Sequence, residues 1–482
     1  MAALPQFHAF LRFSNPCPWR LRLAPLLLAL FLVHAGRADE VEADGKIHVT
    51  YWEKWSGFEG EGMRQVVERF NRSQDRIIVD YFTTSSIGRK TLIATAGGDP
   101  PDVAGLWSQR VPQFAEAAAL TPLEPFLLRD GFTVEQWLAR YEPVYARICR
   151  YAGTVYAGIS SPAIIAFHWN KTLFRQAGLD PDRPPRTIAE LDAFSERLTR
   201  RDPRTGDILQ TGFLPQDPGW WPWVFYAWFG GKVFDGENIT IGTDPQNFAA
   251  AQWVASYTHR LGKADLQKFA SGFGLPGSAD AAFMSGKVAM ILQGVWYNNY
   301  IQQYRPGLDY GVARWPTALP GLENFSLAEA DVLVIPRGAK NPDAAWEFIK
   351  YVNSPNARAE RFEDLDGLEL LNFLLQKQSP LREWSPYFST QHPHPQIHVF
   401  RELSRSEQAQ AAPATGMYNL IENELRFTFE QIRLLLLPPD DALRGVHDRL
   451  SRAWSRYRLS LERHGQSFPG ADARTAPVPS AP

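Results

Sequence analysis

The sequence predicts an α/β protein in which helices cover a largely parallel sheet. Apolar residues alternate in "KIHVTYW" (46–52), as they do in a half-buried strand. They recur at helical spacing in "EGMRQVVERFNRS" (61–73), and "RIIVDYF" (76–82) again has the pattern of a strand. A third strand is expected in "PPDVAGLW" (100–107). Strands that alternate with helices are typical of parallel sheets with helices on both faces.

Polar and aromatic loops follow each of these strands. Open α/β sheets bind ligands beyond the carboxyl ends of their strands, so ligand contacts are expected in segments 52–56, 83–87 and 102–107. Asp102 fits a turn or a helix cap equally well. The glycine-rich stretch "EKWSGFEGEG" (53–62) is interpreted as a turn.

A second α/β unit is expected to begin near Tyr151. Strands are predicted in segments 151–160, 161–171, 309–316 and 330–338, and helices in 187–199 and 341–355. Asn341 has the place of a helix cap, with Pro342 in the first turn. The tail 463–482 has a composition typical of disorder.

Charge and motifs exclude several classes of function. The chain has 50 basic and 52 acidic residues and a formal net charge of −2, so it has no excess of positive charge that would favour nucleic acid binding. The sequence has no phosphate-binding G-x-x-x-x-G-K-[ST] loop, no H-E-x-x-H and no C-x-x-C, and no cofactor is expected. His392, His394 and His398 lie in a proline-containing segment, which favours a solvated loop over a metal site.

The N-terminus has the features of an export signal. Arginines precede the apolar run "LAPLLLALFLVHA", and cleavage is expected after Ala35 or Ala38, so residues 1–38 are predicted to be a signal peptide. An uncleaved segment would instead anchor the protein. Only Cys149 remains in the mature chain, which excludes an internal disulfide. A soluble periplasmic or extracellular protein is the simplest interpretation.

The aromatic stretch "PGWWPWVFYAWFGG" (218–231) is too short to span a membrane. Its second half, with Val224, Phe225, Trp228 and Phe229 at helical spacing, fits a buried helix. Its first half offers flat aromatic surface to a ligand.

Several motifs in the correct order resemble family 1 extracellular solute-binding proteins, the sugar-capturing subunits of ATP-binding cassette importers. "FMSGKVAMILQGVW" (283–296) resembles the family signature, "GDPPDVAGLW" its G-x-x-P-D-V segment, and "NPDAAWEFIKYVNSP" a late helix. The likeness covers the chain from about Lys46 to about Leu459. The chain departs from the family pattern at Trp169, and at 329–331, where members often have Gly-Gly.

The resemblance implies a type II periplasmic-binding-protein-like fold with two lobes that close around a ligand. It implies a first lobe of 46–159 plus 314–366 and a second of 160–313 plus 367–462, with crossings near Ile159, Ala313 and Gly367. The implied partners are a sugar and the permease subunits of a transporter, and the chain is expected to be a monomer that does not bind nucleic acid.

Loop position and the resemblance together select the candidate ligand contacts. Sugars combine apolar faces with hydroxyl edges, so tryptophan rings and carboxylates are favoured. The candidates are Trp52, Glu53, Trp55, Ser85, Asp102, Trp107, Trp220, Trp221, Trp296, Trp315, Asp331 and Tyr418. An oligosaccharide receptor without catalytic activity is the leading interpretation; the alternatives are a secreted glycoside-active enzyme and a membrane-anchored sugar sensor.

Overall fold

The computed structural model describes residues 39–216 and 221–463. The predicted signal peptide, Trp220 and the tail 464–482 lie outside these ranges. The strands are β1 (Ile47–Glu53), β2 (Ile77–Thr83), β3 (Val103–Trp107), β4 (Arg150–Tyr151), β5 (Thr154–Val155), β6 (Gly158–Asn170), β7 (Arg200–Arg201), β8 (Ile208–Gln210), β9 (Met290–Gly294), β10 (Tyr310–Ala313), β11 (Ser326–Val334) and β12 (Ala409–Gln410).

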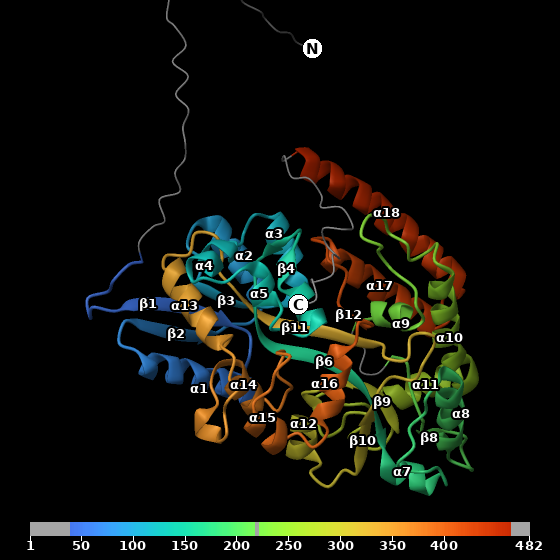
Figure 1. The fold of residues 1–482 in the computed structure, drawn as a ribbon. Helices are drawn as coiled ribbons and strands as arrows, with labels where there is room; N and C mark the ends of the chain where they lie inside the picture. Colours follow the sequence, from blue (N-terminus) through green and yellow to red (C-terminus); the bar gives the residue numbers. More distant parts are fainter. Residues whose placement is uncertain (1–38, 217–220, 464–482) are drawn as a thin grey trace, which may run out of the picture. The chain divides into compact units, whose positions relative to one another are not determined.

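Helices account for most of the remaining chain (Figure 1). They are α1 (Gly57–Ser73), α2 (Ile87–Gly97), α3 (Val111–Glu116), α4 (Glu124–Arg129), α5 (Val134–Leu138), α6 (Pro143–Ile148), α7 (Lys171–Gln176), α8 (Ile188–Leu198), α9 (Trp223–Trp228), α10 (Pro245–Leu261), α11 (Lys263–Ala270), α12 (Tyr297–Tyr304), α13 (Pro342–Val352), α14 (Gly367–Leu374), α15 (Pro386–Gln391), α16 (Ile397–Arg405), α17 (Tyr418–Arg433) and α18 (Pro439–Arg463), with short 3₁₀ helices at Ser108–Arg110 and Phe362–Asp364.

The predicted α/β class is confirmed. One sheet has the order β10-β6-β11-β3-β1-β2, with β12 paired to β11 and β9 paired to β6. Strand β1 pairs in parallel with β2 and β3, as the sequence predicts, but β11 is antiparallel to both β3 and β6. The parallel expectation therefore holds for the first three strands and not for β6, β9, β10 and β11.

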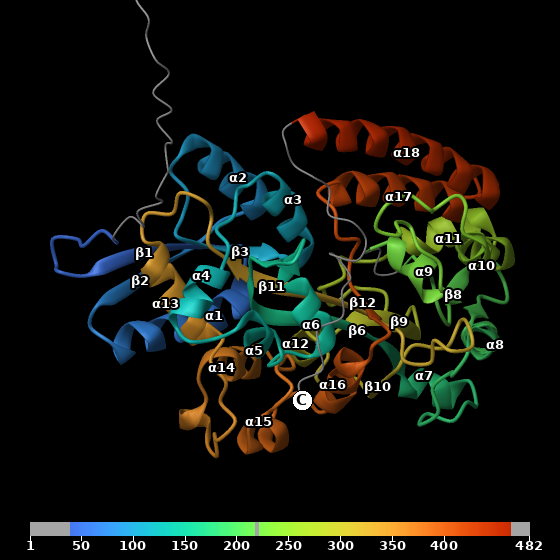
Figure 2. The same ribbon diagram turned by 45° about the horizontal axis from the view of Figure 1, so that its top comes forward.

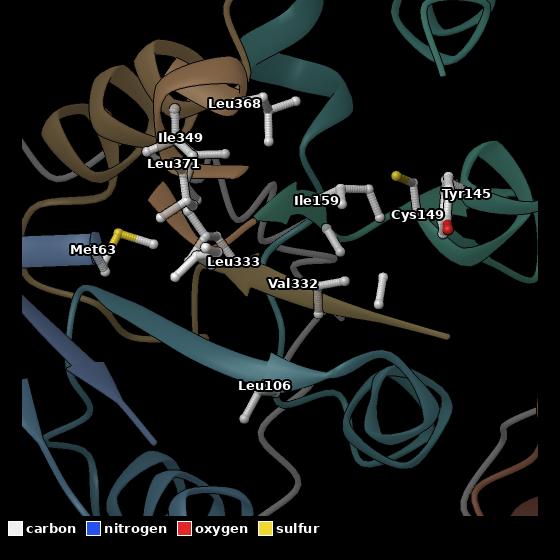
Figure 3. Close-up of a cluster of buried hydrophobic side chains, with 14 of the residues drawn as sticks. Met63, Leu106, Tyr145, Cys149, Ile159, Val332, Leu333, Ile349, Leu368 and Leu371 are labelled. Atoms are coloured by element: carbon white, nitrogen blue, oxygen red, sulfur yellow. The ribbon is translucent and has the colours of Figure 1, made fainter. Parts of the chain in front are cut away.

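Two hydrophobic cores explain the antiparallel strands. Strand β6 begins in the first core with Ile159 and ends in the second with Phe167, whereas β11 starts in the second core with Leu327 and ends in the first with Leu333. One strand leaves the first core and the other returns to it, so the two run in opposite directions. Figure 3 shows strands β3, β6 and β11 contributing Leu106, Ile159, Val332 and Leu333 to the first core.

The second core is mainly helical. Helices α9, α10, α17 and α18 supply many of its side chains, and both views show α17 and α18 side by side (Figures 1 and 2). Val224, Phe225 and Trp228 are buried there, which confirms the predicted buried helix. Leu368 and Phe400 pack in the first core, although the predicted boundary near Gly367 assigns them to the second lobe. The lobe boundaries remain a prediction.

The turn expected in residues 53–62 is largely helix, because α1 begins at Gly57. Its glycines permit close packing and do not break the helix. A Cβ on Gly60 would lie 2.9 Å from the Trp55 carbonyl oxygen, and one on Gly62 would lie 2.9 Å from Leu375. A glycine-rich pattern can therefore mark a close contact as well as a turn.

Candidate functional site

Tryptophan rings and lysine ammonium groups alternate in one cluster, in which Trp55 belongs to the first core and Trp296 packs against both cores. The Lys54 Nζ atom lies 5.1 Å from the ring centroid of Trp55 and 5.2 Å from that of Trp107. The Lys377 Nζ atom lies 5.6 Å from the Trp55 ring and 5.8 Å from the Trp296 ring. These distances are in the range of cation–π contacts. We refer to Lys54, Trp55, Trp107, Trp296 and Lys377 as the aromatic–lysine cluster.

The topology of the sheet brings these residues together. Strand β1 ends at Glu53 and β3 at Trp107, and the parallel pairing of the two strands puts both ends at one edge of the sheet. Trp296 follows β9, packs against both cores, and so lies at their junction. Trp107 is 43% exposed, which leaves part of its ring open to a ligand.

An ion-pair network holds Lys54 in place. Its ammonium group lies 2.8 Å from Asp331 Oδ1 and 3.1 Å from Glu53 Oε1. Burial alone would lower the pKa of Lys54, but attraction by Asp331 and Glu53 raises it, so the side chain stays charged. Glu53 is fully buried and accepts a 2.6 Å hydrogen bond from the Tyr51 hydroxyl. This network links the end of β1 to β11.

Two glycines leave the space that the site needs. A Cβ on Gly105 would lie 1.9 Å from Glu53 Oε2, so β3 can pass this carboxylate only without a side chain there. A Cβ on Gly294 would lie 2.3 Å from the Trp296 ring. The spacing of glycine and tryptophan in "QGVW" thus reflects the ring of Trp296 lying over the backbone of Gly294.

Trp221 extends the cluster toward the second core. Its ring makes an edge-to-face contact with Trp296, with centroids 6.4 Å apart and planes at 71°. The backbone of Trp221 has a φ of 45°, in the left-handed region that bulky residues seldom adopt. Such local strain is frequent at ligand-binding sites, where the surrounding structure holds an unfavourable conformation.

A cavity of about 730 Å³ lies beside the cluster. Its walls come from α3 and α6 on one side and from α9 and the loop 231–236 on the other, and they include Ser108 and Trp223. Ser108 directly follows Trp107, and Trp223 lies two residues after Trp221, so the cavity adjoins the backbone segments that carry these two tryptophans. None of the predicted site residues that the structure describes lines the cavity itself.

Glu329 is the buried carboxylate of this cavity. It accepts hydrogen bonds from the Ser108 hydroxyl at 2.6 Å and from the Ala412 backbone N–H at 2.7 Å. Burial raises its pKa to about 7, so the group is about half protonated near neutral pH. The sequence placed Glu329 only among the departures from the family pattern.

The structure brings together many of the predicted residues but not all of them. Glu53, Trp55, Trp107, Trp221, Trp296 and Asp331 join the cluster and its ion pairs. Trp52 points to the other face of β1, where it packs against the first core, and Ser85 is exposed in the loop after β2. No described contact joins either of these to the cluster.

Three other predicted residues have structural partners. Asp102 accepts hydrogen bonds from the backbone N–H groups of Thr50 in β1 and of Asn341 before α13, so its carboxylate joins two segments of the fold. Trp315 is 3% exposed and donates a hydrogen bond to the Ile165 carbonyl. Tyr418 is buried behind the cavity wall, where its hydroxyl accepts a 3.2 Å hydrogen bond from the Trp223 indole.

The two lysines were missed by sequence reasoning. Lys54 lies in the predicted loop after β1, and a charged residue between two tryptophans was the available signal. Lys377 follows α14, far along the chain, and pairs with Glu59 at 2.7 Å. No local pattern in the sequence identifies this contact, because its partners come from two distant segments, 55–59 and the region of Trp296.

The histidine segment differs from the solvated loop that the sequence predicted. His394 is 1% exposed, and its ring packs edge-to-face on Phe400. Burial lowers the pKa of His394 to about 3 and that of His392 to about 4, so both are neutral. Within residues 39–216 and 221–463 no group of three potential ligand side chains is placed to hold a metal ion.

No helix in the described part of the chain combines the length and the apolar character needed to cross a membrane. The free thiol of Cys149 is buried, and burial raises its pKa to about 12. It is therefore a packing residue of the first core.

Comparisons with known proteins show the family and the fold of the chain. The family model of the bacterial extracellular solute-binding proteins matches residues 56–359. The maltotriose-binding protein of Pyrococcus abyssi is 21% identical over 345 residues, which are 69% of this chain and 68% of the relative. A glycerol-3-phosphate-binding periplasmic protein of Agrobacterium fabrum is 25% identical over 62% of this chain and 66% of its own length.

Solved structures extend the likeness to the whole fold. The mannobiose-bound protein CpMnBP1 superposes with a TM-score of 0.70 at 26% identity, covering 83% of this chain and 98% of that one. The sugar-binding protein MalE of Xanthomonas citri has a TM-score of 0.68 at 19% identity, over 86% and 99% of the two chains. The two-lobed fold of these proteins is thus shared by this chain.

Proposed function

Since this chain belongs to the bacterial extracellular solute-binding proteins, we propose that it captures an oligosaccharide between its two cores and delivers it to an ATP-binding cassette transporter. The observation that carries the proposal is the aromatic–lysine cluster beside a cavity of about 730 Å³. Small-molecule sites are commonly clefts of about 300–1,000 Å³ with apolar walls and a few placed polar groups.

The chemistry of the site suits a sugar. The exposed part of Trp107 and the partly buried ring of Trp296 offer flat apolar faces to the C–H side of a sugar ring. Lys54, held between Glu53 and Asp331, is a charged donor fixed at the floor of the site. The relatives that bind maltotriose and mannobiose support a ligand of two or three sugar units.

The proposed role includes export and action as a monomer. The ligand contacts then act together: Trp107 at the end of β3, Trp221 against the second core, and Trp296 at the junction of the two cores. Closure of the two cores around the sugar would bury all three rings. The protein would act as a receptor that releases its ligand chemically unchanged.

Isothermal titration against a panel of neutral and acidic mono-, di- and trisaccharides, including mannobiose, mannotriose and maltotriose, tests the proposal. Each sample is analysed for products after titration. Stoichiometric binding of unchanged sugar with quenching of tryptophan fluorescence is expected. Conversion of sugar by sub-stoichiometric protein would instead establish a glycoside-active enzyme, and a mature protein retained in membranes would favour an anchored sensor.

A further inference from the structure

The cavity beside the cluster has an excess of positive charge in a protein whose total formal charge is −2. Four basic side chains line it, from Arg147, Arg150, Lys232 and Arg382, against three carboxylates. The overall composition therefore does not describe the local field that a ligand meets in this cavity.

The three carboxylates are already engaged. Glu407 faces Arg147 at 3.9 Å. Asp235 accepts hydrogen bonds from the backbone N–H groups of residues 237 and 238 within its own turn, at 2.8 and 2.7 Å. Glu329 accepts its two hydrogen bonds from Ser108 and Ala412, and its raised pKa withdraws part of its negative charge near neutral pH.

Two of the basic groups have no described carboxylate within ion-pair distance, although Lys232 attracts Asp235 and Arg382 attracts Glu142. Among the described residues, neither Lys232 nor Arg382 forms an ion pair. Arg382 donates a 2.8 Å hydrogen bond from Nε to the Tyr141 carbonyl, which fixes the side chain, and it attracts the carboxylate of Glu142, which is itself paired with Arg405 at 3.0 Å. Tyr141 belongs to the first core, whereas Val233, next to Lys232, belongs to the second. The two charges thus enter the cavity from different cores.

From this arrangement we infer that the bound saccharide is acidic, and that its carboxylate or phosphate group lies between Lys232 and Arg382 while its rings contact the tryptophans. The inference rests on the proposed function and specifies its substrate class. An anion at this position would satisfy both basic groups at once. Arg382 is suited to it, because a guanidinium group binds carboxylate and phosphate with paired hydrogen bonds.

Paired ligands test the inference. Each acidic sugar is titrated beside a neutral sugar of the same ring number, such as digalacturonate with galactobiose and maltose 6-phosphate with maltose, within the full saccharide panel. The tightest ligand of the panel is expected to be acidic, to exceed its neutral partner by about ten-fold or more in affinity, and to lose this advantage at high salt. The two pairs separate a carboxylate from a phosphate, and inorganic phosphate alone serves as the sugar-free control.

Variants connect the preference to the two residues. Lys232→Met and Arg382→Gln should reduce the acidic preference about ten-fold each while the affinity for the neutral partner changes little. Lys268→Met, which removes an exposed ammonium group paired with Asp207, is the matched control and should leave both affinities unchanged. Melting curves identify any variant that is not folded.

The outcomes are distinct. If the tightest ligand is neutral, if both variants retain the acidic preference, or if inorganic phosphate binds as well as the sugar phosphate, the inference is overturned while sugar binding stands. If the panel contains no ligand at all, the proposed function itself fails.

Discussion

Replacement of Trp296 by alanine is the most direct test of the aromatic–lysine cluster. The ring lies at the junction of the cores, with the Lys377 ammonium 5.8 Å from its centroid and Trp221 against it at 6.4 Å. The cation–π and the edge-to-face contact are each worth about 0.5–1.5 kcal/mol, so the free energy of unfolding should fall by about 1–3 kcal/mol. Loss of an anchoring aromatic typically costs about 2–4 kcal/mol in binding, or roughly thirty-fold to a thousand-fold in affinity.

Trp315→Ala is the matched control. This tryptophan is 3% exposed, donates a hydrogen bond to Ile165, and packs at a right angle against Trp228. Its loss creates a cavity in the second core and should lower the free energy of unfolding by about 3–5 kcal/mol. Urea melts and titrations below the melting temperature of each variant measure both quantities. If the Trp296 variant binds sugar like the parent protein, or the Trp315 variant loses affinity while folded, the assignment of these two rings is refuted.

Three further changes have defined outcomes. Gly105→Ala should lower the melting temperature because the new Cβ would lie 1.9 Å from Glu53 Oε2. Gly97→Ala is the control and should leave the melting temperature unchanged, because nothing lies within 4 Å of its Cβ. Equal effects of the two variants would contradict this reasoning. Lys54→Met leaves two buried carboxylates without a counter-ion and should lower the free energy of unfolding, measured in urea melts, by about 3–5 kcal/mol. A decrease of less than about 1 kcal/mol would show that the ion-pair network does not stabilise the fold. The pKa of Glu329 rises to about 7 on folding, so the folded state binds more protons than the unfolded state between about pH 4.5 and 7. The free energy of unfolding should therefore fall as the pH rises through that window. Glu329→Gln should flatten this decline, and an unchanged pH profile would assign the decline to other groups.

Local patterns predicted the parts of the fold that depend on local order. The alternation in 46–52 and the spacing in 61–73 correspond to β1 and α1, because burial of one face fixes both periods. Trp55 and Trp107 could be selected because they lie at or just after the carboxyl end of a predicted strand, and Trp296 because it ends the motif that resembles the family signature. Strand direction in β6 and β11 could not be predicted from local pattern, since it depends on which core each strand enters.

Contacts between segments distant in sequence explain the features that local patterns did not predict. Lys377 reaches Trp55, Glu59 and Trp296 from a segment whose own sequence has no distinguishing pattern. The prolines around His394 predicted a solvated loop, but Phe400 and the surrounding helices bury this residue. In both cases the environment of the residue is supplied by elements distant in sequence, which periodicity and composition do not describe.

The contact between Gly294 and Trp296 restricts the order in which mutations can accumulate. A side chain at position 294 would lie 2.3 Å from the indole ring, so a substitution there is harmful while the ring is present. Once the tryptophan has been replaced by a small residue, the same substitution no longer meets the indole ring. The two positions are therefore epistatic: a lineage that abandons this ring can lose the glycine afterwards, but the reverse sequence of steps passes through a damaged protein.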